Sequence, residues 1–447
     1  MWSTRPALVL VVACTGTGTP DDKSDGSHTV TTSTTTGTTT PTTSTTTGPI
    51  TIDMSGTMTG QESGRAGWSV AFLGDGRLIV GAPSVPYTPE QAGEFIDDVV
   101  YVTEGGDGAL PVEVPAIVTD DAWPDTDPDL ALNKNGFGFA VVSVGDVTGD
   151  GQDDVAVADT PTADRGTGRW SIAPGPTFDV PFLLADWGTG AGAAVACGDV
   201  NGDGEPDLCT SEGVVFGPIT GGSTLGMSWP AEEGRRVGAL DVDGDGSMEL
   251  AVSDSGTESV YLVEPAAVGA VSLPAVATVT WSTSGDSVTA IATGDLDADG
   301  LPELVIGLFD ASGAGTVYIG APAGGGALAG SFATVPVPAD ALAVGDFDGD
   351  GDDDLAVGSG SAVSAWLGPV AAGPVALGTE AATYIGRQNP SDGFGFSLAS
   401  ADADGDGRHD LAIGAPYDNF FDPPPTGASE GYGEQGRVSI LGGAGLP

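Results

Sequence analysis

The stretch Ala341-Leu-Ala-Val-Gly-Asp-Phe-Asp-Gly-Asp-Gly-Asp-Asp-Asp-Leu-Ala-Val-Gly358 decides the fold of this 447-residue chain. It places a nine-residue acidic loop, Asp346 to Asp354, between two short apolar segments. Large and small side chains alternate in the flanking segments with a period of two, which is typical of β-strands. The stretch therefore predicts an antiparallel hairpin whose turn is strongly acidic.

The acidic loop occurs six times along the chain. The copies are Asp146–Asp154, Asp199–Asp207, Asp241–Glu249, Asp295–Glu303, Asp346–Asp354 and Asp402–Asp410. Their first residues are 53, 42, 54, 51 and 56 residues apart. A repeat of this length indicates an architecture built from copies of one small unit.

Each loop carries the residue types that a calcium ion requires. Calcium takes six to eight oxygen ligands, and loop positions 1, 3, 5 and 9 supply side-chain oxygens. Position 7 varies freely, which suits a ligand that acts through its backbone carbonyl, and position 6 is always glycine. The predicted ligand residues are Asp146, Thr148, Asp150, Gln152, Asp154, Asp199, Asn201, Asp203, Glu205, Asp207, Asp241, Asp243, Asp245, Ser247, Glu249, Asp295, Asp297, Asp299, Leu301, Glu303, Asp346, Asp348, Asp350, Asp352, Asp354, Asp402, Asp404, Asp406, Arg408 and Asp410.

Two other interpretations of the loops are less favoured. An EF-hand needs a glutamate at position 12 and flanking helices, whereas position 12 here is apolar, as at Val252, Val357 and Ile413. Solvated acidic turns without an ion would bring mutually repelling carboxylates together six times at similar spacing. About six calcium ions are therefore the expected cofactors.

The segments around the loops predict four strands in each repeat. A third strand follows each hairpin, as in Val99–Val102, Ser259–Val263, Thr316–Ile319 and Arg437–Leu441, and a weaker fourth follows, as in Ala277–Trp281. Four strands in about 50 residues are typical of a β-propeller blade. The expected fold is all-β, a seven-bladed β-propeller of four-stranded antiparallel blades.

The seventh unit stands at the front of the repeat region and has lost its acids. Gly67–Leu73 and Gly76–Pro83 match the last repeat, but only Asp75 remains between them, so no ion is assigned there. The last repeat has three strand segments and stops near Leu441. Ile50–Met54 is expected to complete that blade and to close the ring.

The repeats resemble FG-GAP repeats, the blades of the integrin α-subunit propeller and of many bacterial surface proteins. Gly136–Ala140 and Gly393–Ser397 match the FG part of the signature, and Gly81–Pro83 and Gly414–Pro416 match the GAP part. The middle repeats keep the acidic loop but lose these signatures. The resemblance covers about residues 50–447 and implies a calcium-stabilised propeller.

The N-terminal region reads as an export signal and a tether. Arg5 precedes an apolar run that ends Val11-Val12-Ala13-Cys14, which resembles a bacterial lipobox, so Cys14 is the expected lipidation site and residues 1–14 the signal. An ordinary signal peptide is the alternative. Residues 15–49 form a disordered linker, in which fourteen of the twenty residues from Thr29 to Gly48 are threonine. The propeller then spans 50–447, lipid-anchored at the outer membrane or cell surface, or else secreted or periplasmic.

Two of the three cysteines are expected to form a disulfide. Cys197 lies two residues before its acidic loop and Cys209 two residues after. Antiparallel strands around a nine-residue loop bring these positions together, and an exported chain permits the bond. Two buried free thiols are the alternative.

Function is expected on the face opposite the acidic loops. The longest insertions, about 84–97, 119–135 and 417–435, belong to that face and carry Tyr87, Trp123, Tyr417, Phe420 and Phe421 as possible ligand contacts. These aromatic side chains suit a sugar or a protein partner. The alternative is that they pack on one another.

Composition narrows the classes of function. The net charge is −51, which argues against nucleic acid, and only His28 and His409 could serve imidazole chemistry. No catalytic residue is assigned. The leading hypothesis is a monomeric, non-enzymatic binding module for adhesion to an unidentified protein or glycan. The alternatives are a lectin-like, hydrolase or lyase carbohydrate-active protein, and a structural part of an envelope assembly.

Overall fold

The computed structural model describes a large part of the repeat region. The described residues are 65–83, 99–104, 113–119, 138–158, 170–178, 182–184, 194–230, 232, 235–265, 269–321, 325–327, 333–360, 362–370, 382–385, 392–417 and 436–442. The predicted signal, Cys14, the threonine-rich linker and the predicted strand at 50–54 lie outside these ranges. The one helix of the described residues, α1 (Leu273–Val276), is too short to cross a membrane.

The described strands form seven small sheets that correspond in order to the seven predicted units. Sheet 1 is β1 (Ser69–Phe72), β2 (Leu78–Ala82), β3 (Val99–Glu104) and β4 (Glu113–Thr119). Sheet 2 is β5 (Ala140–Gly145), β6 (Asp154–Ala158), β7 (Trp170–Ala173) and β8 (Phe182–Leu183). Sheet 3 is β9 (Ala194–Ala196), β10 (Leu208–Thr210), β11 (Gly213–Val215) and β12 (Met227–Ser228). Sheet 4 is β13 (Val237–Leu240), β14 (Glu249–Asp254), β15 (Ser259–Val263) and β17 (Ala277–Ser282). Sheet 5 is β18 (Ser287–Gly294), β19 (Glu303–Phe309), β20 (Gly315–Gly320) and β22 (Ala333–Val335). Sheet 6 is β23 (Ala341–Gly345), β24 (Asp354–Ser359), β25 (Ala362–Trp366) and β26 (Ala382–Ile385). Sheet 7 is β27 (Ser397–Ala401), β28 (Asp410–Ala415) and β29 (Arg437–Leu441).

The register of the hairpins follows the sequence pattern. In sheet 6 the pairing runs from Ala341 opposite Gly358 to Gly345 opposite Asp354, so the acidic loop is the turn between β23 and β24. The acidic loops of the other five sheets likewise join the first strand to the second. The predicted hairpins and third strands are thus confirmed.

Two very short strands extend neighbouring sheets in a way that the sequence did not predict. β16 (Gly269–Ala270), from the connection that leads to β17, pairs in parallel with β12 of sheet 3. β21 (Gly326–Ala327), from the connection that leads to β22, pairs in parallel with β17 of sheet 4. The outer edges of sheets 3 and 4, which would otherwise expose unpaired backbone groups, are therefore partly covered by the next repeat.

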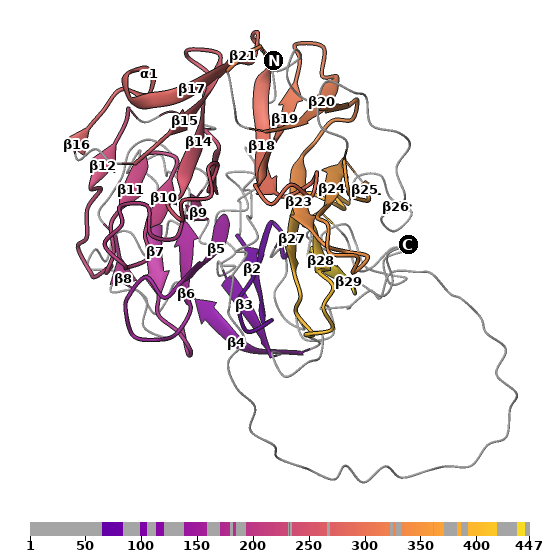
Figure 1. Cartoon of the computed structure of the whole chain (residues 1–447). Helices are drawn as coiled ribbons and strands as arrows, with labels where there is room; N and C mark the ends of the chain where they lie inside the picture. The colour runs from indigo at the N-terminus through magenta and orange to yellow at the C-terminus, as the bar shows by residue number, and fades with distance from the viewer. Residues whose placement is uncertain are drawn as a thin grey trace, which may run out of the picture.

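The seven sheets surround a common centre (Figure 1). The first strand of each sheet contacts the first strands of its two neighbours, in the order β1, β5, β9, β13, β18, β23, β27 and back to β1. Ala66, just before β1, also forms a parallel bridge with Gly436, just before β29. This all-β arrangement is consistent with a β-propeller.

The hydrophobic core lies between neighbouring sheets. One cluster joins Trp281 of sheet 4, Ile306 of sheet 5 and Leu355 of sheet 6, and a second joins sheets 7, 1 and 2. Second strands such as β2 and β28 are buried along their whole length, because a sheet packs on each of their faces. Burying one such side chain contributes about 1.5–3 kcal/mol, so contacts between these strand faces hold the sheets together. The acidic loops lie at the ends of the strands.

Candidate metal centres

The six acidic loops share one hydrogen-bonded skeleton. The position 1 carboxylate accepts the N–H of the position 6 glycine at 2.7–3.0 Å in each loop. The position 5 carboxylate accepts the N–H of position 7 at 2.8–3.0 Å. The position 6 glycines have φ between 87° and 98°, as predicted, a conformation that side chains rarely adopt.

Position 9 ties the loop to the sheet beneath it. Its side chain is buried in all six loops, and one carboxylate oxygen accepts an N–H from position 2, or from position 3 in sheet 2, at 2.8–2.9 Å. In sheets 2, 3 and 6 the other oxygen accepts the N–H of a glycine beyond the third strand, Gly175, Gly217 or Gly368. Position 9 therefore braces the hairpin and also faces the loop.

The carboxylates gather closely enough to hold a cation. Ligand atoms from positions 1, 3 and 5 lie within 4.8 Å of one another in sheets 4 and 5, and those from positions 1, 3 and 9 do so in sheets 6 and 7. The Oδ1 atom of Asp297, at position 3 of sheet 5, is buried without a hydrogen-bond partner. An all-oxygen set with an unpaired carboxylate oxygen suits a hard divalent cation such as calcium.

In the described loops of sheets 2 and 3, no three carboxylates come within 4.8 Å of one another. In sheets 2 and 3 position 3 is Thr148 or Asn201, which leaves fewer carboxylates but keeps an oxygen donor. Leu301, at position 7 of sheet 5, is 36% exposed, so this apolar side chain does not fill the core. Exposure at this position agrees with a role for its backbone rather than its side chain.

The loops carry uncompensated negative charge when no cation is bound. Burial, and then repulsion from Asp297, raises the pKa of Glu303 to about 7. Burial also raises the pKa of Asp354 to about 6. The pKa values of Asp154, Asp207 and Glu249 shift in the same direction, again chiefly because these position 9 groups are buried. A divalent cation would offset this cost.

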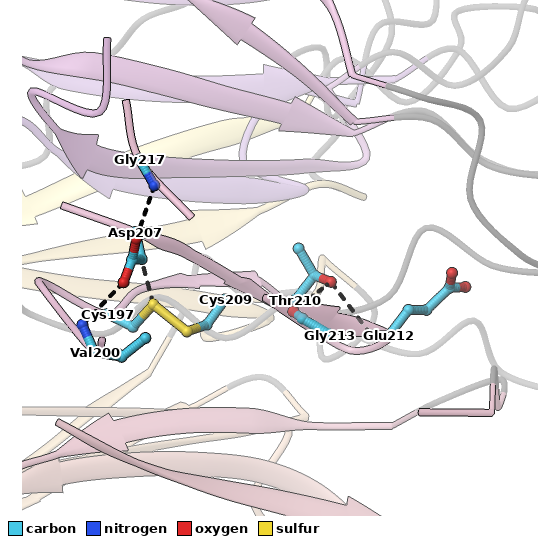
Figure 2. Close-up of a disulfide and its surroundings, with 8 residues drawn as sticks. All are labelled: Cys197, Val200, Asp207, Cys209, Thr210, Glu212, Gly213 and Gly217. Atoms are coloured by element: carbon cyan, nitrogen blue, oxygen red, sulfur yellow. Dashed lines mark hydrogen bonds between the residues drawn. A yellow bond between two sulfur atoms is a disulfide. The ribbon is translucent and has the colours of Figure 1, made fainter. Parts of the chain in front are cut away.

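The disulfide is confirmed. Cys197 and Cys209 are bonded across the loop of sheet 3, with their Cα atoms 5.8 Å apart (Figure 2). The two residues are not directly opposite, because Cys209 pairs with Val195 in the ladder, so the bond joins the strands diagonally. Figure 2 shows it beside Asp207, the position 9 residue of the same loop.

Of the five aromatic residues assigned to a ligand face, the structure describes only Tyr417. Its ring packs against Phe396 at 5.6 Å and Trp68 at 6.1 Å between centroids, and Arg65 lies 5.4 Å from it. Tyr417 therefore packs against rings that directly precede β1 and β27, outside the predicted insertions. Tyr87, Trp123, Phe420 and Phe421 lie outside the described residues.

Sequence reasoning missed the residues that link the repeats. Position 2 is apolar in all six loops and buried in five of them, for example Phe347 and Leu296. In sheet 4 an arginine pair takes the place of the FG signature. Arg235 donates to the Ser211 carbonyl of sheet 3 at 3.4 Å, and Arg236 donates to the Thr289 carbonyl of sheet 5 at 2.7 Å. The signal was available, since the chain has only 12 Lys and Arg and two of them are adjacent here.

Comparison with known families agrees with this geometry. The FG-GAP repeat model matches residues 339–377 and 394–441, and the FG-GAP-like repeat model matches residues 241–306 and 295–357. The matched residues run through sheets 4 to 7, which include the four carboxylate clusters. No curated protein matches the chain.

Proposed function

We propose that this FG-GAP repeat protein is a calcium-stabilised, non-enzymatic binding module that is exported and displayed at the bacterial surface. The observation that carries the proposal is the hydrogen-bonded skeleton shared by the six loops, which in sheets 4 to 7 groups three carboxylates around one point. Calcium at these points would cancel charge and fix each hairpin. The primary test is the calcium content of the dialysed full-length protein, for which we expect about six ions per chain. Fewer than two would contradict it.

The proposal includes closure into a seven-bladed propeller. The cyclic order of contacts among the first strands supports it, and so does the bridge between Ala66 and Gly436. In a closed ring no sheet is a free end. Hydrogen exchange should therefore protect β1 and β27 as strongly as β13 and β18. Rapid exchange confined to β1 and β27 would indicate an open ring.

The proposed ligand is a protein or glycan that binds at the face opposite the acidic loops. The topology supports this placement, because all six loops join first to second strands and therefore share one face. A rigid scaffold with insertions on its other face is a common arrangement for recognition. Binding of the calcium-loaded protein to a glycan array and to intact cells separates the two ligand classes. Hydrolysis of bound glycans would instead favour the carbohydrate-active alternative, and a lack of both kinds of binding would favour the structural role.

Export and lipid anchoring belong to the same proposal. They rest on the sequence around Cys14, and FG-GAP repeats are typical of extracellular or surface proteins. Metabolic labelling with a fatty acid should mark the wild-type chain and not Cys14→Ser. Equal labelling of both chains would remove Cys14 as the lipidation site.

A further inference from the structure

The acidic loops of sheets 5 and 6 are joined by a residue that is not a predicted ligand. Asp353, at position 8 of the sheet 6 loop, accepts the N–H of Asp295 through Oδ2 at 2.9 Å. The N–H of Asp353 also donates to the carbonyl of Asp295 at 3.3 Å. Asp295 is the position 1 ligand of the sheet 5 loop. One residue of the sheet 6 loop thus holds both backbone polar groups of the first ligand residue in the sheet 5 loop.

A second path joins the same two loops. Asp354, the position 9 ligand of sheet 6, accepts the N–H of Gly368 at 2.7 Å. Two residues later, Val370 donates its N–H to the carbonyl of Leu296 at 2.5 Å, and Leu296 is position 2 of the sheet 5 loop. Adjacent residues of the sheet 6 loop, Asp353 and Asp354, are therefore connected to adjacent residues of the sheet 5 loop, Asp295 and Leu296.

The other side of sheet 5 lacks the position 8 link. There the equivalent residue is Pro302, which has neither an N–H nor an accepting side chain. Between sheets 1 and 2 the link is present, since Asp153 Oδ2 accepts the N–H of Gly74 at 3.0 Å, but sheet 1 has no acidic loop. Sheets 4 and 5 therefore both carry acidic loops, but Pro302 stands where the linking aspartate would be. Sheets 1 and 2 keep the linking aspartate, Asp153, but sheet 1 has no acidic loop.

We infer that the calcium sites of sheets 5 and 6 bind cooperatively and that Asp353 couples them. The inference rests on the calcium binding proposed above. An ion in the sheet 6 loop gathers Asp346, Asp348 and Asp354, and it thereby fixes Asp353, which lies beside Asp354. Asp353 in turn fixes the backbone of Asp295, whose carboxylate must point into the sheet 5 site. Ordering one loop removes part of the ordering cost of the other, which is a coupling free energy between two sites.

The test follows each loop separately in the full-length protein. Hydrogen exchange with mass spectrometry over a calcium-buffered series gives one midpoint for residues 295–303 and another for 346–354. Asp348→Ala disables the sheet 6 site, and we expect it to raise the calcium midpoint of the sheet 5 loop about fivefold or more. The matched control, Asp243→Ala, disables the sheet 4 site across the boundary at Pro302 and should leave the sheet 5 midpoint unchanged.

Three further variants complete the test. Asp297→Ala disables the sheet 5 site, and linkage requires that it shift the sheet 6 midpoint by the same factor. This reciprocal variant still tests the coupling if Asp348→Ala folds poorly. Asp353→Ala removes the acceptor for the Asp295 N–H and should reduce the effect of the sheet 6 site on the sheet 5 midpoint, while the path through Gly368 and Val370 is kept. Asp153→Ala removes the same kind of bond next to sheet 1, and it should change neither midpoint.

The outcomes separate this inference from the proposed function. If calcium protects both loops but Asp348→Ala and Asp297→Ala each leave the neighbouring midpoint unchanged, the coupling is overturned while calcium binding stands. A shift of undiminished size in Asp353→Ala overturns the role of Asp353. If calcium protects neither loop in the wild-type protein, the proposed calcium binding itself fails.

Discussion

The first hairpin of sheet 1 and the first hairpins of sheets 2 to 7 meet the same electrostatic demand in different ways. The sheet 1 turn keeps one carboxylate, Asp75, and Arg77 pairs with it at 2.7 Å. The Arg77 guanidinium also lies 5.0 Å from the Phe178 ring and donates to the Pro176 carbonyl at 3.2 Å, both in the next repeat. The acidic loops of sheets 4 to 7 instead each bring three carboxylates within 4.8 Å of one another. The comparison teaches that the chain itself supplies a cation at the one hairpin without an acidic loop, whereas at the other six the proposed calcium ions would supply the positive charge.

Calcium withdrawal should distinguish the two kinds of hairpin more strongly than any other change. Each proposed site would stabilise the fold by about 2.7 kcal/mol when free calcium is 100-fold above its Kd, so the loss of several sites would remove most of a typical stability. We expect EDTA to lower the Tm substantially and to speed hydrogen exchange in the six acidic loops. Exchange in the Leu73–Arg77 turn should change least. An unchanged Tm would contradict the role of calcium.

Removal of a position 9 brace should have the next largest effect. Asp354→Ala leaves the N–H groups of Phe347, which is buried, and Gly368, which is half-buried, without their acceptor, and it also removes a predicted ligand. We expect a loss of about 2–4 kcal/mol in the free energy of unfolding, measured by denaturant titration with calcium present. Asp75→Ala, the matched change in the turn to which no ion is assigned, should cost no more than about 1 kcal/mol because the Asp75 carboxylate is exposed. Equal losses would show that the two kinds of hairpin are held alike.

The acidic hairpins, the ion-ligand pattern and the disulfide could be predicted from the sequence because they are local. A nine-residue loop between alternating segments fixes which residues face one another, and Cys197 and Cys209 lie on the same hairpin. The links between repeats could not be predicted in this way. Asp353 reaches Asp295 across 58 positions, and β16 and β21 are two-residue strands whose partners lie in the preceding sheet. Nothing in their composition distinguishes such segments from turns.

The stability of the metal-free protein should also depend on pH through a carboxylate of the acidic loops, Glu303. Burial raises the pKa of Glu303 from 4.5 to about 7 in the folded state. The folded state then binds a proton more tightly than the unfolded chain, so its stabilising contribution is complete below about pH 4.5 and is lost as pH rises through about 7. Denaturant unfolding of calcium-stripped protein should show lower stability at pH 8 than at pH 5, and Glu303→Gln should reduce the difference. Calcium-loaded protein should not show this loss, and if it does, the ion does not compensate Glu303.

The smallest expected effect concerns the internal cation of sheet 1. Arg77→Gln removes the ion pair with Asp75 and the contact with the Phe178 ring, while its amide can still donate a hydrogen bond. An exposed ion pair contributes about 0–1 kcal/mol and a cation–π contact about 0.5–1 kcal/mol, so we expect a loss of about 1 kcal/mol. This loss should be the same with calcium and with EDTA, because no ion is assigned to the turn. Arg408→Gln, a change of the same kind in the sheet 7 loop, is the control whose effect should depend on calcium. If the cost of Arg77→Gln disappears when calcium is added, the first hairpin also draws its positive charge from the ion, and the distinction between the two kinds of hairpin fails.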